Sequence, residues 1–156
     1  MRRAARALAD AGLEPIVVVV SADARFADAL AGLQVVTVTN QGPEQGISRS
    51  IAIGLGAVAD TAEAALIAVG DQPHLSAEAI GELVRAFLPG RIVVPRYGDH
   101  RGNPPIFDRR FFPELVRLTG DRGGQAVILA HPEAVIEVSL PAAMGDDVDR
   151  PEDWPA

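Results

Sequence analysis

The sequence predicts one three-layer α/β domain with a mostly parallel sheet, spanning residues 1–156. Two unbroken apolar runs, residues 16–20 and 65–69, have the pattern of strands that are buried on both faces. Segments with helical patterns alternate with the strands, which is typical of a sheet covered by helices on each side. A length of 156 residues and a hydrophobic content of 48% are sufficient for a single domain with its own core.

The first half of the chain is expected to alternate between helices and strands. A run of strong helix formers ends before Gly12, which suits a left-handed C-terminal cap. Ser21, directly after the first strand, has the residue type that begins a helix. Ile51, Leu55 and Val58 fall on one face of a third helix. The expected helices are residues 2–11, residues 22–31 and a segment behind Ser48 or Ser50, and the expected strands are residues 16–20, 35–39 and 65–69.

The second half continues the same alternation. Ser76 is the expected N-cap of a helix with Glu78 in its first turn, and Pro89 and Gly90 end that helix. Gln125 begins another helix after a glycine-rich turn. The expected helices are residues 77–88, 111–118 and 125–131, and the expected strands are residues 92–95 and 135–138.

The composition excludes several classes of protein. A net charge of −7 argues against nucleic-acid binding through phosphate neutralisation, because that mode needs a basic face. The chain has no cysteine, and His74, His100 and His131 lack the spacing of metal ligands, so a thiolate or histidine-rich metal site is not expected. The apolar run at residues 16–20 is too short to span a bilayer, and no signal-peptide core follows Met1. A cytoplasmic protein is therefore expected.

Asp71 is the first candidate for a functional residue. It follows the strand at residues 65–69 after Gly70, and ligands of open α/β sheets bind beyond the carboxyl ends of the strands. Pro73 prevents the strand from continuing. The same pattern also fits an ordinary turn in which the aspartate bonds its own backbone. The position therefore predicts either a ligand-binding carboxylate or a turn residue.

Three polar, glycine-containing loops, residues 40–46, 97–103 and 119–124, could converge on the same crevice. The free amide groups at the helix start behind the first loop suit an anion, although a plain capped helix explains the same residues. The second loop would let backbone approach a ligand closely, or it is a solvated connection. In the acidic tail, Asp149 and Glu152 have the spacing of a capping box, so a helix start is the alternative to a ligand there.

Five segments resemble, in the right order, motifs of the molybdenum cofactor nucleotidyltransferase family, in particular its cytidylyltransferase-like branch. They are residues 40–54 (NQGPEQGISRSIAIG), 70–73 (GDQP), 101–107 (RGNPPIF), 120–124 (GDRGG) and 147–153 (DVDRPED). Together they extend across nearly the whole chain. The resemblance implies a Rossmann-like nucleotidyltransferase domain.

The resemblance also implies a reaction, in which CTP or GTP is joined to the phosphate of a molybdopterin and pyrophosphate is released. Mg²⁺ would be the cofactor, held by Asp71 and Asp149, because this ion takes carboxylate and phosphate oxygens. Arg101 is the candidate for holding the acceptor phosphate, with Arg49 and Arg122 behind it. The implied substrate-binding residues are Asn40, Gly46, Ser48, Ser50, Gln72, Pro73, Gly102, Asn103, Asp121 and Gly123. A molybdoenzyme or its chaperone is the implied protein partner.

One part of the family pattern has no counterpart in this sequence. The family begins with a strand and a glycine-rich loop whose lysine offsets the triphosphate charge, whereas residues 2–11 match the helix that normally precedes the second strand. The first strand–helix unit is therefore expected to be missing. In this topology that strand lies in the middle of the sheet. Its two neighbours are expected to pair directly or to leave backbone groups unpaired.

Two other interpretations stay open beside the molybdopterin enzyme. One is an enzyme of the same superfamily that uses a sugar phosphate or phospholactate. The other is a truncated, non-catalytic paralogue that binds a pterin or a partner enzyme. A phosphorelay receiver also places an aspartate at a strand end, but it needs a lysine late in the chain, and all 14 basic residues here are arginine.

Overall fold

The fold has three layers, with strands between two groups of helices. The computed structural model describes residues 1–22, 29–72 and 74–144. The α-helices are α1 (Arg2–Asp10), α3 (Ile47–Gly56), α4 (Ala77–Ala86), α5 (Phe112–Leu115) and α6 (Gln125–Ala130). The strands are β1 (Val17–Val20), β2 (Val36–Thr39), β3 (Ala64–Leu66), β4 (Ile92–Tyr97), β5 (His100–Arg101), β6 (Ile106–Asp108) and β7 (Val135–Leu140). Short 3-10 turns are η1 (Pro43–Gln45), η2 (Arg109–Phe111), η3 (Gly120–Arg122), η4 (Pro132–Ala134) and η5 (Ala142–Met144).

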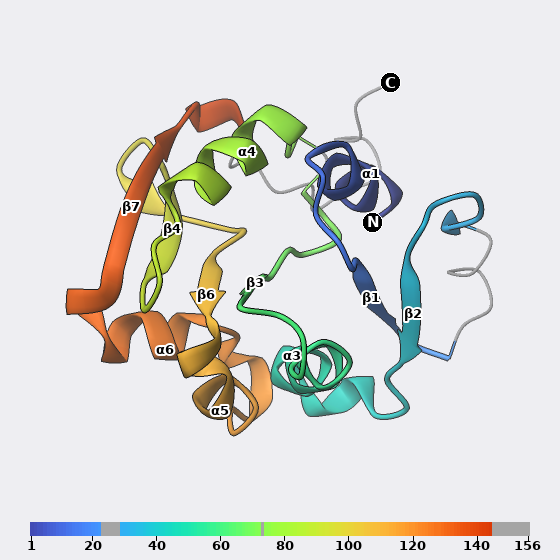
Figure 1. The fold of residues 1–156 in the computed structure, drawn as a ribbon. Coiled ribbons are helices and arrows are strands. Elements are labelled where there is room, and N and C mark those ends of the chain that lie inside the picture. The colour runs from blue at the N-terminus through green and yellow to red at the C-terminus, as the bar shows by residue number, and fades with distance from the viewer. Residues whose placement is uncertain (23–28, 73, 145–156) are drawn as a thin grey trace.

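The two helical layers lie on opposite faces of the strands. α1 and α4 cover one face, and α3, α5 and α6 cover the other (Figure 1). This arrangement confirms the predicted α/β class. Most of the helix expected at residues 22–31 lies outside the described residues. Among the described residues, no helix is both long enough and apolar enough to cross a membrane.

In the described part of the chain, the strands form two separate sheets rather than one. β1 and β2 pair in parallel, with Val17 opposite Val36. The second sheet has the order β3-β6-β4-β5, with β7 beside β4. Only the β4–β7 ladder of this sheet is parallel, and the other three ladders are antiparallel. The sheet is thus more mixed than predicted, partly because the two-residue turn from Tyr97 to His100 joins β4 directly to β5, a connection that only antiparallel strands permit.

Strand β3 is shorter than the apolar run that predicts it. Ile67 still donates its backbone N–H to the Pro105 carbonyl at 3.0 Å, so the chain remains extended beyond the assigned strand. Pro104 and Pro105 have no N–H to donate, and the ladder with β6 therefore ends at Ile106. Within the described residues, β6 therefore holds the segment that leads to the predicted site on one side only.

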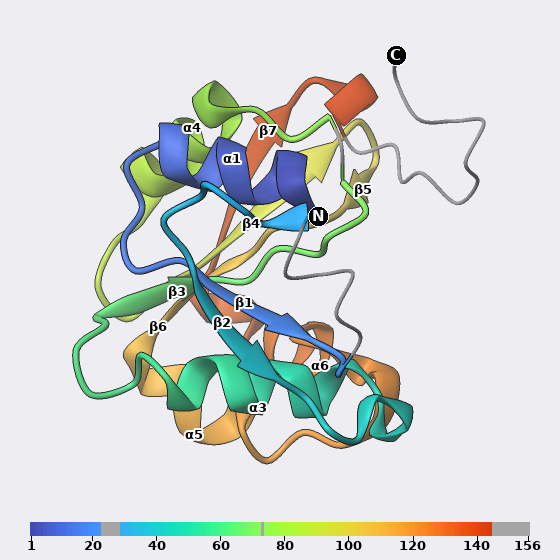
Figure 2. The same ribbon diagram turned by 90° about the vertical axis from the view of Figure 1, so that its right-hand side faces the viewer.

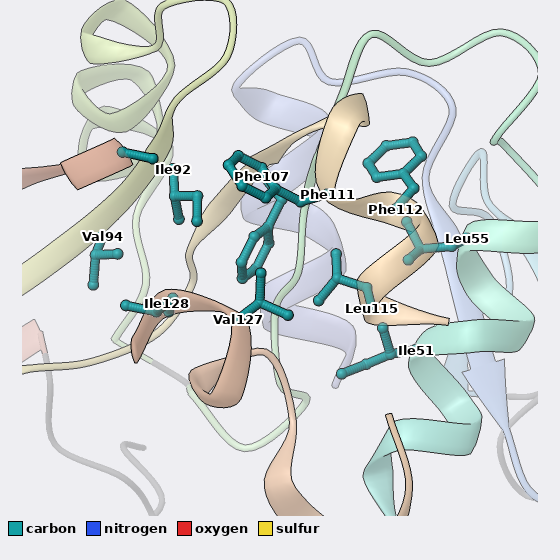
Figure 3. Close-up of a cluster of buried hydrophobic side chains, with 11 residues drawn as sticks. Ile51, Leu55, Ile92, Val94, Phe107, Phe111, Phe112, Leu115, Val127 and Ile128 are labelled. Carbon is teal, nitrogen blue, oxygen red and sulfur yellow. The ribbon is translucent and has the colours of Figure 1, made fainter. Parts of the chain in front are cut away.

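The main core lies between the second sheet and helices α3, α5 and α6. Phe107 of β6 is fully buried there, with Phe111 beside it and Leu115 from α5 packed against them (Figure 3). On the opposite face, Leu83 of α4 packs against Val93 of β4. Burial on both faces of β4 is what the continuous apolar run at residues 92–95 predicts.

The predicted helix cap at α4 is confirmed. The Ser76 side chain accepts a hydrogen bond from the Ala79 backbone N–H at 3.2 Å. Gly12, expected to end the first helix, has φ +76°, a left-handed conformation that glycine adopts without strain. Both helices therefore begin or end where their residue types indicate.

Candidate functional site

Asn40 organises the loop between β2 and α3. Its side chain is 2% exposed, and it donates from Nδ2 to Ser50 Oγ at 3.0 Å. Its Oδ1 accepts from the Gly42 N–H at 2.9 Å and from Arg49 Nε at 3.0 Å. A single buried amide therefore ties the loop to the first turn of α3.

The turn at η3 sits directly on the N-terminus of α3. Gly46 has φ +89°, and a Cβ there would lie 2.5 Å from the Gly120 carbonyl carbon and 2.7 Å from Asp121 Oδ1. Asp121 Oδ1 accepts a hydrogen bond from the Ile47 N–H at 3.2 Å. The Asp121 carboxylate therefore already accepts from one of the backbone amides that the sequence suggested as anion-binding groups. Gly123 lies nearby, because a Cβ placed on it would be 3.7 Å from Ile47 Cγ2.

Two predicted residues bury polar atoms that have no partner among the described residues. Ser48 is fully buried in the first turn of α3, and its Oγ makes no hydrogen bond. Gln72 is 3% exposed, and its Oε1 is likewise unpaired. Unpaired buried oxygens are uncommon, because each one forfeits its bonds to water. Both oxygens are therefore suited to accept a hydrogen bond from a ligand or to coordinate a cation.

The loop after β5 is fixed to the loop after β3. Gln72 donates from Nε2 to the Asn103 carbonyl at 3.2 Å, and Tyr97 donates from its hydroxyl to the same carbonyl at 2.7 Å. A Cβ on Gly102 would lie 2.7 Å from two carbons of the Tyr97 ring, so only glycine fits there. The structure thus brings together two segments that the sequence analysis selected separately.

Asp71 lies exposed at the carboxyl end of the β3 segment, where the sequence predicts it. The Met1 ammonium donates a hydrogen bond to the carbonyl of the preceding Gly70. Burial lowers the pKa of this ammonium, and the Asp71 carboxylate opposes that shift. Asp71 is therefore exposed to solvent and lies close enough to the N-terminal ammonium for the two charges to interact.

Arg101 has a counter-ion that the sequence analysis missed. Its Nη2 lies 2.6 Å from Glu137 Oε1, and Arg96 Nη1 lies 3.1 Å from Glu137 Oε2. The hydrogen bonds from Arg101 and Arg96 lower the pKa of Glu137. The one signal in the sequence was an acidic residue inside the apolar run at residues 135–138. Any phosphate that binds to Arg101 must therefore share the Arg101 guanidinium group with the Glu137 carboxylate.

The described residues assemble two groups of predicted site residues. One group surrounds the start of α3 and comprises Asn40, Gly46, Ser48, Ser50, Asp121 and Gly123. The other comprises Gln72, Gly102 and Asn103 around Tyr97. Ser50 of the first group and Gly70, which precedes Asp71, line the same cavity.

Only one of the two predicted metal ligands, Asp71, lies among the described residues. Asp149 and Pro73 lie outside the described residues, so the pairing of Asp71 with Asp149 stays a prediction. Within residues 1–22, 29–72 and 74–144, no three acidic or histidine side chains gather into a metal cluster. Asp71 offers a carboxylate and Gln72 an unpaired amide oxygen, and hard oxygen donors of this kind fit Mg²⁺ or Mn²⁺.

The class of the protein follows from these features together with its relatives. Residues 1–135 match the MobA-like NTP transferase domain, and the chain belongs to this family. Membership confirms the family resemblance seen in the motifs.

Individual relatives give a more detailed view. The chain is 30% identical over 159 residues to nicotine blue oxidoreductase from Paenarthrobacter nicotinovorans, covering 96% of this chain and 78% of that protein. The crystal structure of Rv0371c from Mycobacterium tuberculosis H37Rv has a TM-score of 0.79 at 28% identity, covering 98% of this chain and 81% of that one. A second structure of Rv0371c, a complex with manganese, has a TM-score of 0.77 at 26% identity and covers 98% of this chain and 83% of that one.

A more distant structure supports the fold alone. A nucleotidyl transferase from Methanothermobacter thermautotroptrophicus has a TM-score of 0.83 at 19% identity, covering 98% of this chain and 76% of that one. The Rossmann-like nucleotidyltransferase fold that the motifs imply is thereby confirmed.

Proposed function

We propose that this chain is a divalent-metal-dependent nucleotidyltransferase that joins CTP or GTP to the phosphate of a molybdopterin and releases pyrophosphate. The observation that carries the proposal is the position of Asp71, exposed at the carboxyl end of the β3 segment beside Gln72, whose buried Oε1 has no partner among the described residues. Membership of the MobA-like NTP transferase family supports the reaction class. The manganese complex of Rv0371c supports the use of a divalent metal, with Mg²⁺ as the expected ion.

In the proposed reaction an oxygen of the molybdopterin phosphate bonds to the α-phosphorus of the nucleotide. The bond from that phosphorus to the bridging oxygen breaks, and this oxygen leaves with pyrophosphate. A divalent metal held by Asp71 and Asp149 would draw negative charge from the phosphate oxygens. The proposed reaction needs no covalent nucleophile, because such transfers depend mainly on positioning and on charge stabilisation.

The remaining residues are assigned by their contacts. Asn40 holds the loop that would surround the nucleotide, and Ser48 Oγ and Gln72 Oε1 are free to bond it. Arg101 would hold the acceptor phosphate through the remaining part of its guanidinium group, because Glu137 already contacts its Nε and Nη2. A phosphate bound there would lie beside the Glu137 carboxylate, so positive charge is needed to offset both anions. Arg96, on the same carboxylate, supplies the second positive charge.

The test is a product assay on the chain with Mg²⁺ or Mn²⁺, CTP or GTP, and molybdopterin. Pyrophosphate release and the mass of the dinucleotide product are measured. We expect Asp71→Asn to lower the rate by about 100-fold or more, because it removes a carboxylate ligand of the metal that would draw negative charge from the reacting phosphates. Asp60→Asn is the matched control, since Asp60 is an exposed carboxylate just beyond the opposite end of α3.

Other outcomes identify other functions. Pterin binding that is indifferent to metal, without pyrophosphate release, would favour a non-catalytic paralogue. Turnover with a sugar phosphate or phospholactate would keep the reaction class and change the acceptor. An oxidoreductase is a further candidate because of the 30% identity to nicotine blue oxidoreductase. That function would appear as oxidation or reduction of nicotine blue, with no release of pyrophosphate.

A further inference from the structure

Glu137 joins two arginines that come from different strands. Arg101 of β5 donates from Nε to Glu137 Oε1 at 2.7 Å, and its Nη2 lies 2.6 Å from the same oxygen. Arg96 of β4 donates from Nη1 to the other carboxylate oxygen, Oε2, at 3.1 Å. These hydrogen bonds lower the pKa of Glu137, so the carboxylate is ionised at neutral pH. One carboxylate of β7 therefore holds two positive groups side by side.

The three side chains lie on one face of the sheet. Arg96 and Arg101 are direct partners in the antiparallel ladder of β4 and β5, and direct partners place their side chains on the same face. In the parallel ladder of β4 and β7, Glu137 is opposite Val94, which lies two residues before Arg96 and therefore on the same face as Arg96. The side chains of Arg96 and Arg101 are each 42% exposed, and that of Glu137 is 30% exposed. A ligand in solution can therefore reach all three.

Each guanidinium group keeps N–H donors that are unpaired within the described residues. A guanidinium group has five N–H donors. Arg101 directs Nε and Nη2 at Glu137, whereas Arg96 uses Nη1 for Glu137 and Nε for the Gly98 carbonyl at 2.9 Å. Two used donors out of five leave three N–H groups on each arginine. Phosphate oxygens accept hydrogen bonds of this kind, and the planar fork of arginine matches their geometry.

The main chain near Arg101 is fixed to the segment that carries Asp71. Asn103, two residues after Arg101, accepts through its carbonyl from Gln72 Nε2 at 3.2 Å and from the Tyr97 hydroxyl at 2.7 Å. Figure 2 shows the green segment that follows β3 running alongside β5. Two residues of chain span at most about 7 Å, so the main chain of Arg101 lies close to this contact. The Arg101 side chain is the part that still has to be oriented.

We propose that Glu137 is a positioning residue of the acceptor site. Its carboxylate holds the Arg96 and Arg101 guanidinium groups so that their remaining N–H donors can bind one phosphate group together. The inference rests on the proposed function, in which Arg101 binds the acceptor phosphate, and it adds the residue that orients Arg101 before the phosphate arrives. A terminal phosphate suits this site, because its unbridged oxygens can accept hydrogen bonds from both arginines at once.

Two opposing effects decide whether this carboxylate strengthens or weakens phosphate binding. An exposed negative charge beside the site repels the phosphate, which lowers the affinity by less than about 5-fold at physiological salt. Without Glu137, the phosphate itself would have to order each arginine, which lowers the affinity by about 2- to 10-fold per side chain. Because Glu137 holds two side chains, the ordering effect is the larger one. Glu137 is therefore expected to strengthen phosphate binding, although both groups are negatively charged.

The test measures binding of inorganic phosphate to the 156-residue chain without nucleotide, by NMR of the Arg96 and Arg101 Nε–H groups. We expect Glu137→Ala to weaken phosphate binding by about 3-fold or more, although it removes a negative charge. Glu137→Gln keeps one acceptor oxygen and should bind phosphate within about 2-fold of the parent. Asp99→Ala is the matched control, because Asp99 is an exposed carboxylate in the turn of the same hairpin. It should bind phosphate as tightly as the parent or slightly more tightly.

Two further measurements separate positioning from a general structural defect. In the product assay, we expect Glu137→Ala to raise the KM for molybdopterin by about 3-fold or more and to leave the KM for the nucleotide unchanged. A variant that merely loosens the fold would change both KM values. In the parent, the order parameter of the Arg101 Nε–H group should exceed about 0.6, below which a group is flexible. It should fall in Glu137→Ala.

Several results would overturn the inference. Tighter phosphate binding by Glu137→Ala would mean that the carboxylate competes with the phosphate. An equal loss of binding in Asp99→Ala would mean that the charge of the hairpin, and not the contact, is responsible. If Glu137→Ala fails to fold, the parent decides, because a mobile Arg101 side chain or a lack of phosphate binding would contradict positioning. Phosphate binding that depends on Glu137 without pyrophosphate release would refute only the proposed activity. Turnover with an unchanged acceptor KM in Glu137→Ala would refute only this inference.

Discussion

His131 lies where α6 meets α5, with its Nε2 at 2.9 Å from both carboxylate oxygens of Glu114. This hydrogen bond raises the pKa of His131 above its ordinary value of 6.5, and Glu133 acts in the same direction. The folded state therefore favours the protonated imidazole. The pair stabilises the fold fully below about pH 6.5, and this contribution is lost as the pH rises through the raised pKa.

We expect His131→Gln to reduce the fall in stability between pH 6 and pH 8. The measurement is the midpoint of thermal unfolding at both pH values. His100→Gln is the control, because His100 is exposed on β5. If both variants show the same pH dependence, the Glu114 contact does not stabilise the fold.

Asn40 gives a second prediction at the scale of one side chain. Asn40→Ala removes the acceptor of Gly42 and Arg49 and the donor to Ser50. We expect a loss of about 1–3 kcal/mol in the free energy of unfolding, because buried partners are left unpaired. Urea unfolding measures this. Asn103→Ala is the control, since Asn103 accepts through its main-chain carbonyl and should change stability little.

At the scale of elements, the contact between η3 and α3 depends on a residue without a side chain. Gly46→Ala would place a methyl group 2.5 Å from the Gly120 carbonyl carbon in a left-handed backbone conformation. We expect a loss of more than about 1 kcal/mol. Gly56→Ala, in open space at the end of the same helix, should instead gain up to about 1 kcal/mol. Chemical unfolding of the two variants tests the contrast, and equal effects would contradict it.

At the scale of the whole molecule, the apolar runs and helix signals predict the layers well. Ser76 and Gly12 occupy the ends they predict, and the buried strand at residues 92–95 is confirmed. Local pattern does not determine which strands pair. The shortening of β3 depends on Pro104 and Pro105, about 40 residues later in the chain.

In the candidate site, too, the sequence predicts individual residues but not the contacts between them. The sequence selects Asn40 and Asp121, but their partners become visible only when the loops meet. The pairing of Arg101 with Glu137 joins β5 to β7 across 36 positions of sequence. No periodicity encodes such a contact. The pairing of Asp71 with Asp149 stays a prediction, because Asp149 lies outside the described residues.

Strands β1 and β3 also bear on how this chain behaves in solution. In the described part of the chain, each of them pairs with a neighbouring strand along one edge only. Edges with free donors and acceptors accept strands from any source, including other copies of the same chain. The valine run of β1 combines high β-propensity with no charge, a composition that promotes aggregation. The described geometry therefore makes this chain prone to self-association through these edges.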